Sequence, residues 1–361
     1  MTHLFTPLKM RGIEIRNRIG VSPMCQYSAN DGLADDWHLV HLGSRAVGGA
    51  GLVIAEATAV TPEGRISTGD LGIWTDKHAE ALAPVTRFIK KHGAVAGIQI
   101  AHAGRKASRD VPWKGGSAVS QNQGGWQVIG ASALPFADGW QTPREMTVAD
   151  IKDSIETFVM AARRAANVGF QLLEIHAAHG YLLNSFLSPL ANKRTDTYGG
   201  NFEGRTKFLL EVVRATRNVW PETLPMSVRL SCSDWIEGGW NTADTVALSL
   251  ILKKEGVDLI DCSSGGMVPD VKIPVGANYQ VGFAAEVKRQ AHIATAAVGM
   301  ITQPMQADAI VRTEQADLVF LARELLRDPY WPLHAAEAVH QASKAPVPPQ
   351  YQRAFPAPRL N

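Results

Sequence analysis

The run Glu174-Ile-His176-Ala-Ala-His179-Gly-Tyr181 brings two imidazoles and a phenol within six residues. Neutral imidazoles can donate hydrogen bonds to a carbonyl or nitro oxygen and thereby polarise a conjugated C=C bond. Tyr181 could then act as a general acid. A metal pair and a pair of structural histidines are the alternatives. The His-x-x-His spacing is not the i, i+4 pair of a helical zinc motif, and no third ligand of obvious spacing accompanies it.

Cys25 is a second candidate, in the run Pro23-Met24-Cys25-Gln26-Tyr27. A nucleophilic thiol needs a neighbouring base, which His176 could supply, so thiol chemistry stays open as an alternative. Buried thiols are usually inert packing groups, an interpretation that suits Cys232 and Cys262. Three cysteines in a long chain imply no disulfide framework and favour a reducing compartment.

The elements that must position these residues alternate regularly. Short apolar runs, typical of strands buried on both faces of a parallel sheet, are separated by amphipathic stretches. Strands are predicted at residues 18–24, 51–58, 94–100, 171–177, 225–231, 258–264, 294–299 and 317–322, and the clearest helices at 151–167, 202–219, 242–255, 283–290 and 303–313. Eight such units predict an α/β fold, a (β/α)8 TIM barrel formed by one domain over residues 1–361. A doubly wound sheet would need a glycine fingerprint after the first strand, where Ser22-Pro23-Met24-Cys25 stands instead.

Two segments fall outside the repeat. Residues 104–147 are rich in Gly, Trp, Pro and Ser, and a structureless loop of that length is uncommon in a compact domain. We expect this segment to form a small lid with a hairpin over the barrel mouth. Residues 343–361 are Pro-rich and are expected to form an extended C-terminal arm.

Polar and glycine residues cluster at the C-terminal ends of the predicted strands, where a barrel of this kind places its active site. Convergence on one face indicates a single large ligand site. Gly299 and Arg323, at the ends of the last two strands, suit a phosphate, and Gln99 and Arg229 suit a flat heterocycle that becomes anionic on reduction. Taken singly, Gly299 could simply turn the chain and Arg229 could pair with a barrel carboxylate.

Charge balance and the lack of long apolar stretches give no support for several classes of function. Lys and Arg total 36 against 34 Asp and Glu, so charge gives no reason to expect a nucleic-acid or membrane-surface partner. The N-terminus lacks a basic region followed by an apolar run, and no apolar stretch reaches the length of a membrane span. The expectation is a soluble, cytoplasmic protein.

Matches in order along almost the whole chain resemble the Old Yellow Enzyme family of flavin-dependent ene-reductases, in its bacterial branch of xenobiotic reductases and thermophilic-like members. The matching segments are Leu4-Phe-Thr-Pro7, Ser22-Pro-Met-Cys-Gln-Tyr27, Gln99-Ile-Ala-His-Ala-Gly-Arg-Lys106, His176-Ala-Ala-His-Gly-Tyr-Leu182, Lys193-Arg-Thr-Asp-Thr-Tyr-Gly-Gly200, Ala297-Val-Gly-Met300 and Glu324-Leu-Leu-Arg-Asp-Pro-Tyr330.

The resemblance implies roles for individual residues. Pro23, Met24, Cys25, Ala57, Gln99 and Arg229 would hold the isoalloxazine of a non-covalent FMN, and Gly299, Met300, Ala322 and Arg323 its ribityl phosphate, with Ser264 and Gly265 nearby. His176 and His179 would bind the activating group of the substrate, Tyr27 would line the pocket, and Tyr181 would donate a proton. The family commonly has glycine where Ala322 stands, and we expect the extra methyl group not to abolish binding.

The implied reaction is a ping-pong hydride transfer, in which NADPH or NADH first reduces FMN and leaves. An electron-poor alkene (an enone, maleimide or nitroalkene) then takes the place of the nicotinamide in the pocket. The resemblance also implies a homodimer or a dimer of dimers in which Arg353 reaches the neighbouring site. A metal-dependent barrel hydrolase and a non-catalytic flavin-binding barrel are the competing classes. Dienoyl-CoA and trimethylamine dehydrogenase relatives carry an iron–sulfur cluster that three scattered cysteines cannot build.

Overall fold

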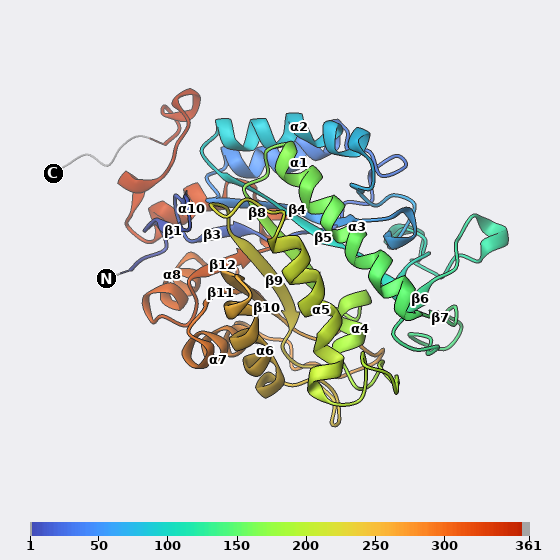
Figure 1. The fold of residues 1–361 in the computed structure, drawn as a ribbon. Helices are drawn as coiled ribbons and strands as arrows, with labels where there is room; N and C mark the ends of the chain where they lie inside the picture. The colour runs from blue at the N-terminus through green and yellow to red at the C-terminus, as the bar shows by residue number, and fades with distance from the viewer. Residues whose placement is uncertain (1, 356–361) are drawn as a thin grey trace.

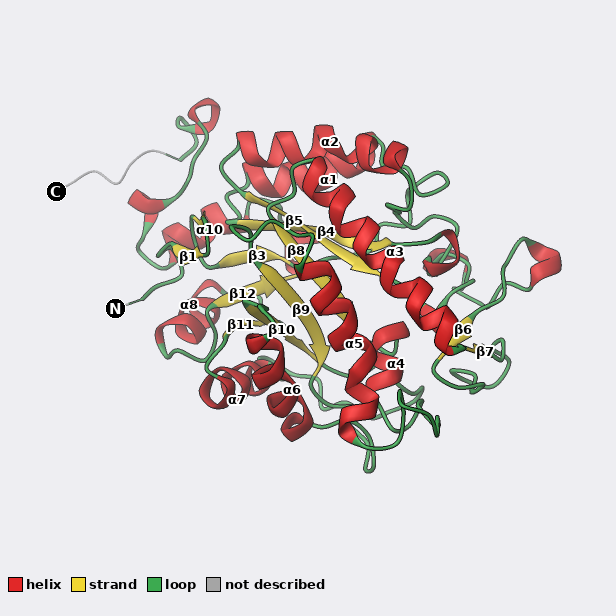
Figure 2. Cartoon of the chain, in the orientation of Figure 1, coloured by secondary structure: helices red, strands yellow, loops and turns green. Residues whose placement is uncertain are grey.

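Buried segments of three to eight residues form the centre of the molecule. The computed structural model describes residues 2–355, and eight strands pair in parallel into a closed barrel, as predicted. In chain order they are β3 (Ile19–Val21), β4 (Leu52–Ala59), β5 (Val95–Ala101), β8 (Leu172–Ala177), β9 (Met226–Ser231), β10 (Leu259–Ser263), β11 (Ala294–Ala297) and β12 (Leu318–Leu321). The barrel closes between β12 and β3. Figure 2 shows the strands at the centre with helices around them.

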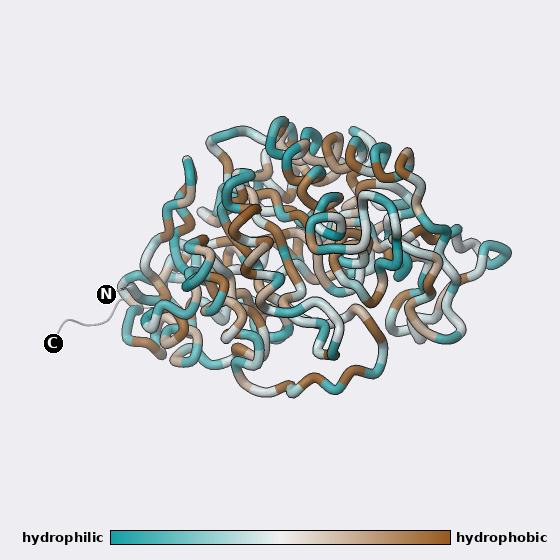
Figure 3. Tube along the Cα trace, turned by 60° about the horizontal axis from the view of Figure 1, so that its bottom comes forward, coloured by the Kyte–Doolittle hydropathy of each residue, from teal (hydrophilic) through white to brown (hydrophobic). Residues whose placement is uncertain are grey.

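Helices follow the strands and cover the outside of the barrel, and apolar segments gather in the interior (Figure 3). They are α1 (Asp36–Val47), α2 (Asp76–Lys91), α3 (Val148–Asn167), α4 (Leu182–Leu187), α5 (Phe202–Arg217), α6 (Thr242–Lys254), α7 (Val281–Ala291), α8 (Pro304–Arg312), α9 (Arg323–Arg327) and α10 (Trp331–Ala338). The five helices predicted from periodicity are α3, α5, α6, α7 and α8. Neither α1 nor α2 was among them, because Gly43 and Pro84 interrupt their helical patterns.

The N-terminal end of the barrel is closed by a hairpin that short-range patterning did not predict. β1 (Leu8–Met10) and β2 (Ile13–Ile15) pair antiparallel. Met10, Ile13 and Ile15 join an apolar cluster with barrel residues such as Leu172 and Leu259. Three-residue strands carry too little periodicity to be recognised in a sequence.

Residues 104–147 leave the barrel after β5 and project from its rim, at the right of Figure 1. Two-residue strands β6 (Ile129–Gly130) and β7 (Arg144–Glu145) pair in parallel and so do not form the predicted hairpin. The antiparallel pairing found in this segment, within the described part of the chain, is a single bridge between Arg109 and Ala118. Glycine-rich turns with positive φ break the segment into short 3-10 turns instead.

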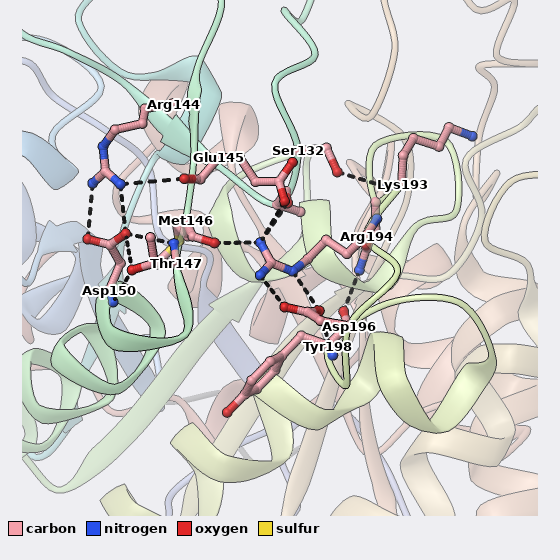
Figure 4. A network of polar contacts seen from close by, with 12 residues as sticks. Ser132, Arg144, Glu145, Met146, Thr147, Asp150, Lys193, Arg194, Asp196 and Tyr198 are labelled. Atoms are coloured by element: carbon pink, nitrogen blue, oxygen red, sulfur yellow. Dashed lines mark hydrogen bonds and ion pairs between the residues drawn. The ribbon is translucent and has the colours of Figure 1, made fainter.

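The base of this excursion is fixed to the barrel by Arg194, which is buried (Figure 4). Its guanidinium donates to the carbonyl oxygens of Ala131 (3.0 Å) and Met146 (2.6 Å) and pairs with Asp196 at 2.5 Å. Ala131 directly follows β6 and Met146 directly follows β7, so they lie side by side at the C-terminal end of this parallel pair. One side chain therefore joins both strands to the loop that follows α4.

The C-terminal segment packs beside α10, on the side of the molecule away from β6 and β7 (Figure 1). The hydroxyls of Tyr330 and Tyr351 are 3.3 Å apart, and the rings of His334 and Phe355 lie 5.9 Å apart. Of the predicted arm, residues 356–361 lie outside the described chain. Within residues 2–355, no helix is both long and apolar enough to cross a membrane.

Candidate active site

The turn after β8 brings His176, His179 and Tyr181 together. The two imidazole rings are 5.2 Å apart, and the His176 and Tyr181 rings are 5.0 Å apart, each pair nearly perpendicular. The turn requires a left-handed backbone at His179 (φ 62°), which Ser231 supports by accepting the His179 N–H at 2.9 Å. The three residues that we expected to polarise and protonate a substrate therefore lie close together in the structure.

Hydrogen bonds define what these side chains can offer. The Ala178 N–H donates to His176 Nδ1 at 3.2 Å, so a neutral His176 carries its proton on Nε2 and can donate from it. His179 Nε2 lies 2.7 Å from Ser263 Oγ. Burial, and then the Arg229 charge, lower the pKa of both histidines well below the usual value, so both rings are neutral. Burial raises the pKa of Tyr181 well above its usual value, so the phenol keeps its proton.

Lys106 supports this turn, although sequence reasoning gave it no role. Its Nζ donates at 2.9 Å to the carbonyl oxygens of both His179 and Gly266, and it lies 5.3 Å from the centre of the Tyr181 ring. Burial lowers the pKa of Lys106 to about 7. Its position directly after Gly104-Arg105 gave no signal, because a lysine in a loop is ordinarily solvated.

The loop after β3 forms another part of the mouth, with Pro23, Met24, Cys25 and Tyr27 partly buried. These residues lie beyond Val21, where β3 ends, so the strand is shorter than predicted. Buried Glu56 accepts the Gln26 N–H at 2.8 Å and so fixes the turn. Ala57 follows Glu56, at a shift in the β4–β5 register.

Burial raises the pKa of the Cys25 thiol well above its usual value, and the neighbouring Asp70 and Glu56 raise it further. A nucleophilic cysteine needs the opposite, an electropositive setting that favours the thiolate. Thiol catalysis by Cys25 therefore lacks support in the geometry.

Gln99 and Arg229 lie inside the barrel at its mouth, on β5 and β9, and are almost completely buried. Gln99 Nε2 donates to Glu174 at 2.9 Å, and Arg229 Nε is 2.9 Å from an Asp261 carboxylate oxygen. Within residues 2–355, Asp261 is the one acid that forms an ion pair with Arg229. The pairing with a barrel carboxylate, raised above as an alternative, is therefore present, and it occupies one edge of the guanidinium.

A cavity of about 270 Å³ opens beside Arg229 at the ends of β10, β11 and β12. Arg229, Gly299, Met300, Ala322 and Arg323, all predicted from the sequence, line it, together with Ser263, Tyr279, Gln280, Val298, Ile301, Thr302, Phe320, Glu324 and Arg327. Of its three arginines, Arg229 pairs with Asp261 and Arg327 pairs with Glu324, so Arg323 leaves the cavity with a net positive charge. Its size and charge suit a narrow anionic group.

Two backbone positions shape this cavity. Gly299 has φ 120°, and a Cβ there would lie 2.8 Å from Gln280 Nε2 and 2.9 Å from the Tyr279 ring. Ala322 has φ −112°, so it does not need a left-handed backbone, but its ψ of −95° lies outside the main regions allowed for a residue with a side chain. Ser264 and Gly265 lie next to the cavity, where Ser264 Oγ donates to Gln280 at 2.5 Å. Tyr279 and Gln280 were not predicted, because they stand in a loop with no recognisable pattern.

Arg353 is not part of this cluster within one chain. It is exposed, in the C-terminal segment that lies beside α10. No metal-binding cluster of three or more His, Cys, Asp or Glu occurs among the described residues. His176 and His179 consequently lack, in that part of the chain, the third protein ligand that a catalytic zinc site uses.

Comparison with known proteins finds relatives along nearly the whole chain. Residues 3–341 match the NADH:flavin oxidoreductase / NADH oxidase family. The chain is 49% identical over 356 residues to an NADPH dehydrogenase of Geobacillus sp. (strain WCH70), covering 98% of this chain and 99% of the relative. It is 44% identical over 354 residues to an NADPH dehydrogenase of Bacillus subtilis (strain 168), covering 98% and 99%.

Solved structures show the same fold. A morphinone reductase structure is 28% identical, with a TM-score of 0.79 over 93% of this chain and 90% of that chain. An Old Yellow Enzyme homologue from Zymomonas mobilis, at 24% identity, has a TM-score of 0.80 over 93% of each chain. The barrel, the cluster at its mouth and a family match over nearly the whole length lead to one conclusion: the chain belongs to the NADH:flavin oxidoreductase / NADH oxidase family of enzymes, which includes the Old Yellow Enzymes.

Proposed function

We propose that this protein is an ene-reductase that uses FMN and NADPH to reduce the C=C bond of electron-poor alkenes such as enones, maleimides and nitroalkenes. The observation that carries the proposal is the grouping of two neutral imidazoles and a protonated phenol at the end of β8, beside Gln99 and Arg229. NADPH is favoured over NADH as the reductant because the related bacterial proteins are named NADPH dehydrogenases.

The residues of the mouth fit FMN. Arg323 and the Gly299–Met300 turn line a positive cavity that would take the phosphate, and Gln99 and Arg229 offer hydrogen bonds to an isoalloxazine. Pro23, Met24, Cys25 and Ala57 would complete the ring site, with Ser264 and Gly265 near the ribityl chain. When bound, FMN supplies the hydride transfer between nicotinamide and alkene, in two half-reactions.

The side chains of this protein would orient and polarise the alkene. His176 donates from Nε2 to the oxygen of the activating group, with His179 as its partner, and withdraws electron density from the double bond. Tyr27 lines the space beside them. Tyr181 holds its proton at neutral pH and delivers it to the carbon next to the activating group.

We further propose that residues 104–147 act as a lid, and that a second subunit completes the site with Arg353. The support is the position of the C-terminal segment, which projects away from the mouth of its own barrel (Figure 1). The exposed Arg353 on such a segment could reach a neighbouring chain in a homodimer.

Steady-state kinetics test the proposed function directly. With NADPH and N-methylmaleimide varied together, the expected double-reciprocal plots are parallel, as in a ping-pong mechanism, and the product is the saturated imide. A protein that purifies without FMN, refuses added FMN, or binds it but leaves the maleimide unreduced would contradict the proposal. Zinc-dependent activity abolished by a chelator would favour the hydrolase alternative instead.

A further inference from the structure

A row of buried polar side chains crosses the barrel interior just below the mouth. Gln99 on β5, Glu174 on β8 and Ser227 on β9 stand opposite one another in the strand register. Glu174 accepts hydrogen bonds from both neighbours, from Gln99 Nε2 at 2.9 Å and from Ser227 Oγ at 3.0 Å. The Glu174 side chain has no exposed surface.

A second buried acid stands nearby. Asp261 on β10 is in register with Arg229 on β9, and it too is fully buried. Its carboxylate meets the Arg229 guanidinium but has no hydrogen bond with favourable geometry to any described residue. The ionisable groups that face Glu174 are Asp261 from β10 and Arg229 from β9, while β5 presents the uncharged Gln99. Two carboxyl groups thus share one cation.

This layer is unusual for the fold, since the interior of a (β/α)8 barrel is normally filled by Val, Ile and Leu. The next layer toward the N-terminal end follows that rule, with Leu172 and Leu259 two residues before Glu174 and Asp261 on the same strands. Burying two acids with a single arginine costs folding free energy, so we expect the two acids to have a role other than packing.

Protonation reduces this cost. Burial, and then the adjacent Asp261 carboxylate, raise the pKa of Glu174 to about 8, against the opposing effect of the Arg229 charge. Burial also raises the pKa of Asp261, to about 6. Near neutral pH, Asp261 then balances Arg229 and Glu174 keeps a proton. Above about pH 8 the layer gains one negative charge.

We propose that Glu174 is a positioning residue of the flavin site, which fixes the amide of Gln99 and, together with Asp261, sets the charge beneath the isoalloxazine. This inference rests on the proposed function, because it assumes that FMN lies against Gln99 and Arg229. With Nε2 committed to Glu174, the Gln99 amide is held in one orientation. Ionised Glu174 disfavours extra negative charge on the cofactor and so lowers its reduction potential.

Glu174→Gln separates the charge from the packing. A glutamine there is nearly isosteric, can still accept from Gln99 and can donate to Ser227, so the layer stays bonded. The measurement is the reduction potential of bound FMN between pH 6 and pH 9.5. At pH 6 the wild type and Glu174→Gln should agree, because Glu174 is protonated. Above pH 8 the wild type should have the lower potential and Glu174→Gln should lack that inflection.

The expected size follows from the effect of one nearby charge. A like charge at close range changes an equilibrium constant by about tenfold or more. At pH 9.5, the preference of Glu174→Gln for reduced over oxidised FMN should therefore be about tenfold greater than that of the wild type. Ser227→Ala removes a hydrogen bond that stabilises the Glu174 carboxylate, and it should therefore move the wild-type inflection to higher pH without abolishing it.

Asp234→Asn is the matched control. Asp234 is also a buried carboxyl group, but it lies in the loop after β9 and bonds Ser188 and Trp240 outside the barrel interior. The reduction potential of FMN bound to Asp234→Asn should equal that of the wild type at every pH.

The outcomes keep the two proposals apart. A wild-type protein that binds no FMN refutes the proposed function itself. If FMN binds normally and the curves of the wild type and Glu174→Gln superimpose, the role of Glu174 is refuted alone. Should Glu174→Gln fail to fold, Ser227→Ala decides: an upward shift of the inflection supports the inference, and an unchanged curve overturns it.

Discussion

Gly299→Ala tests the cavity that we assign to the FMN phosphate. Gly299 has φ 120°, and a side chain at such a backbone angle costs about 1–3 kcal/mol. The added Cβ would lie 2.8 Å from Gln280 Nε2 and 2.9 Å from Tyr279, so both side chains must move. Gln280 then loses its 3.1 Å hydrogen bond to the Val298 carbonyl oxygen, at about 1 kcal/mol. The expected total is about 2–4 kcal/mol of unfolding free energy.

Two assays measure this effect. For a chain of this length, about 1.3 °C of Tm corresponds to 1 kcal/mol, so Gly299→Ala should lower Tm by about 3–5 °C. Because Tyr279 and Gln280 line the cavity, the Kd of the apoprotein for FMN, measured by fluorescence quenching, should rise about tenfold or more, the effect of losing about 1.4 kcal/mol of binding free energy.

Gly282→Ala is the control for both assays. Gly282 is an exposed residue of α7, has no positive φ, and nothing lies within 4 Å of its added Cβ. Its Tm should be unchanged or slightly higher, and its Kd for FMN unchanged. Equal Kd values for Gly299→Ala and Gly282→Ala would refute the assignment of the cavity to the phosphate.

Further variants test the other parts of the site. Tyr181→Phe should slow alkene reduction by about 10²–10⁴ while leaving FMN reduction by NADPH unchanged in stopped-flow experiments, and equal loss in both half-reactions would mean that Tyr181 is structural. His176→Ala or His179→Ala should weaken phenol binding by about 1–3 kcal/mol in a spectral titration with FMN content intact, whereas unchanged affinity would contradict their role. Arg194→Ala leaves two buried carbonyl groups unpaired, so it should lower the free energy of unfolding by about 2–4 kcal/mol and speed proteolysis within residues 104–147. Cleavage as slow as in the wild type would show that Arg194 does not anchor this segment. Arg353→Ala should raise the KM for the alkene, and mixing it with Tyr181→Phe should restore activity in hybrid dimers; no restoration would count against a shared site.

The barrel was predictable because its strands are buried on both faces and read as apolar runs in the sequence. The cluster at the end of β8 was predictable for a related reason. Once a strand is known to end at Ala177, a barrel places His179 and Tyr181 at its mouth. The short elements were not predictable, because the hairpin of β1 and β2 and the pairing of β6 with β7 depend on contacts between distant parts of the chain.

The supporting groups of the site were also hidden. Lys106 was expected in a solvated loop, and Glu174 and Asp261 stand in predicted strands that offered no partner for their charge. All three are largely or fully buried. Their roles follow from partners on other strands and loops: the His179 and Gly266 carbonyl groups for Lys106, Gln99 for Glu174, and Arg229 for Asp261. Such pairings require the three-dimensional register, which no local pattern supplies.

Anaerobic half-reactions of the purified protein test the central claim most directly. NADPH added in the absence of oxygen should bleach the absorption of oxidised FMN, and cyclohexenone added afterwards should restore it with the formation of one cyclohexanone per flavin. Tyr181→Phe should bleach as fast as the wild type and recover far more slowly. A wild-type protein that bleaches with NADPH but never recovers with an enone, maleimide or nitroalkene would contradict the assignment as an ene-reductase.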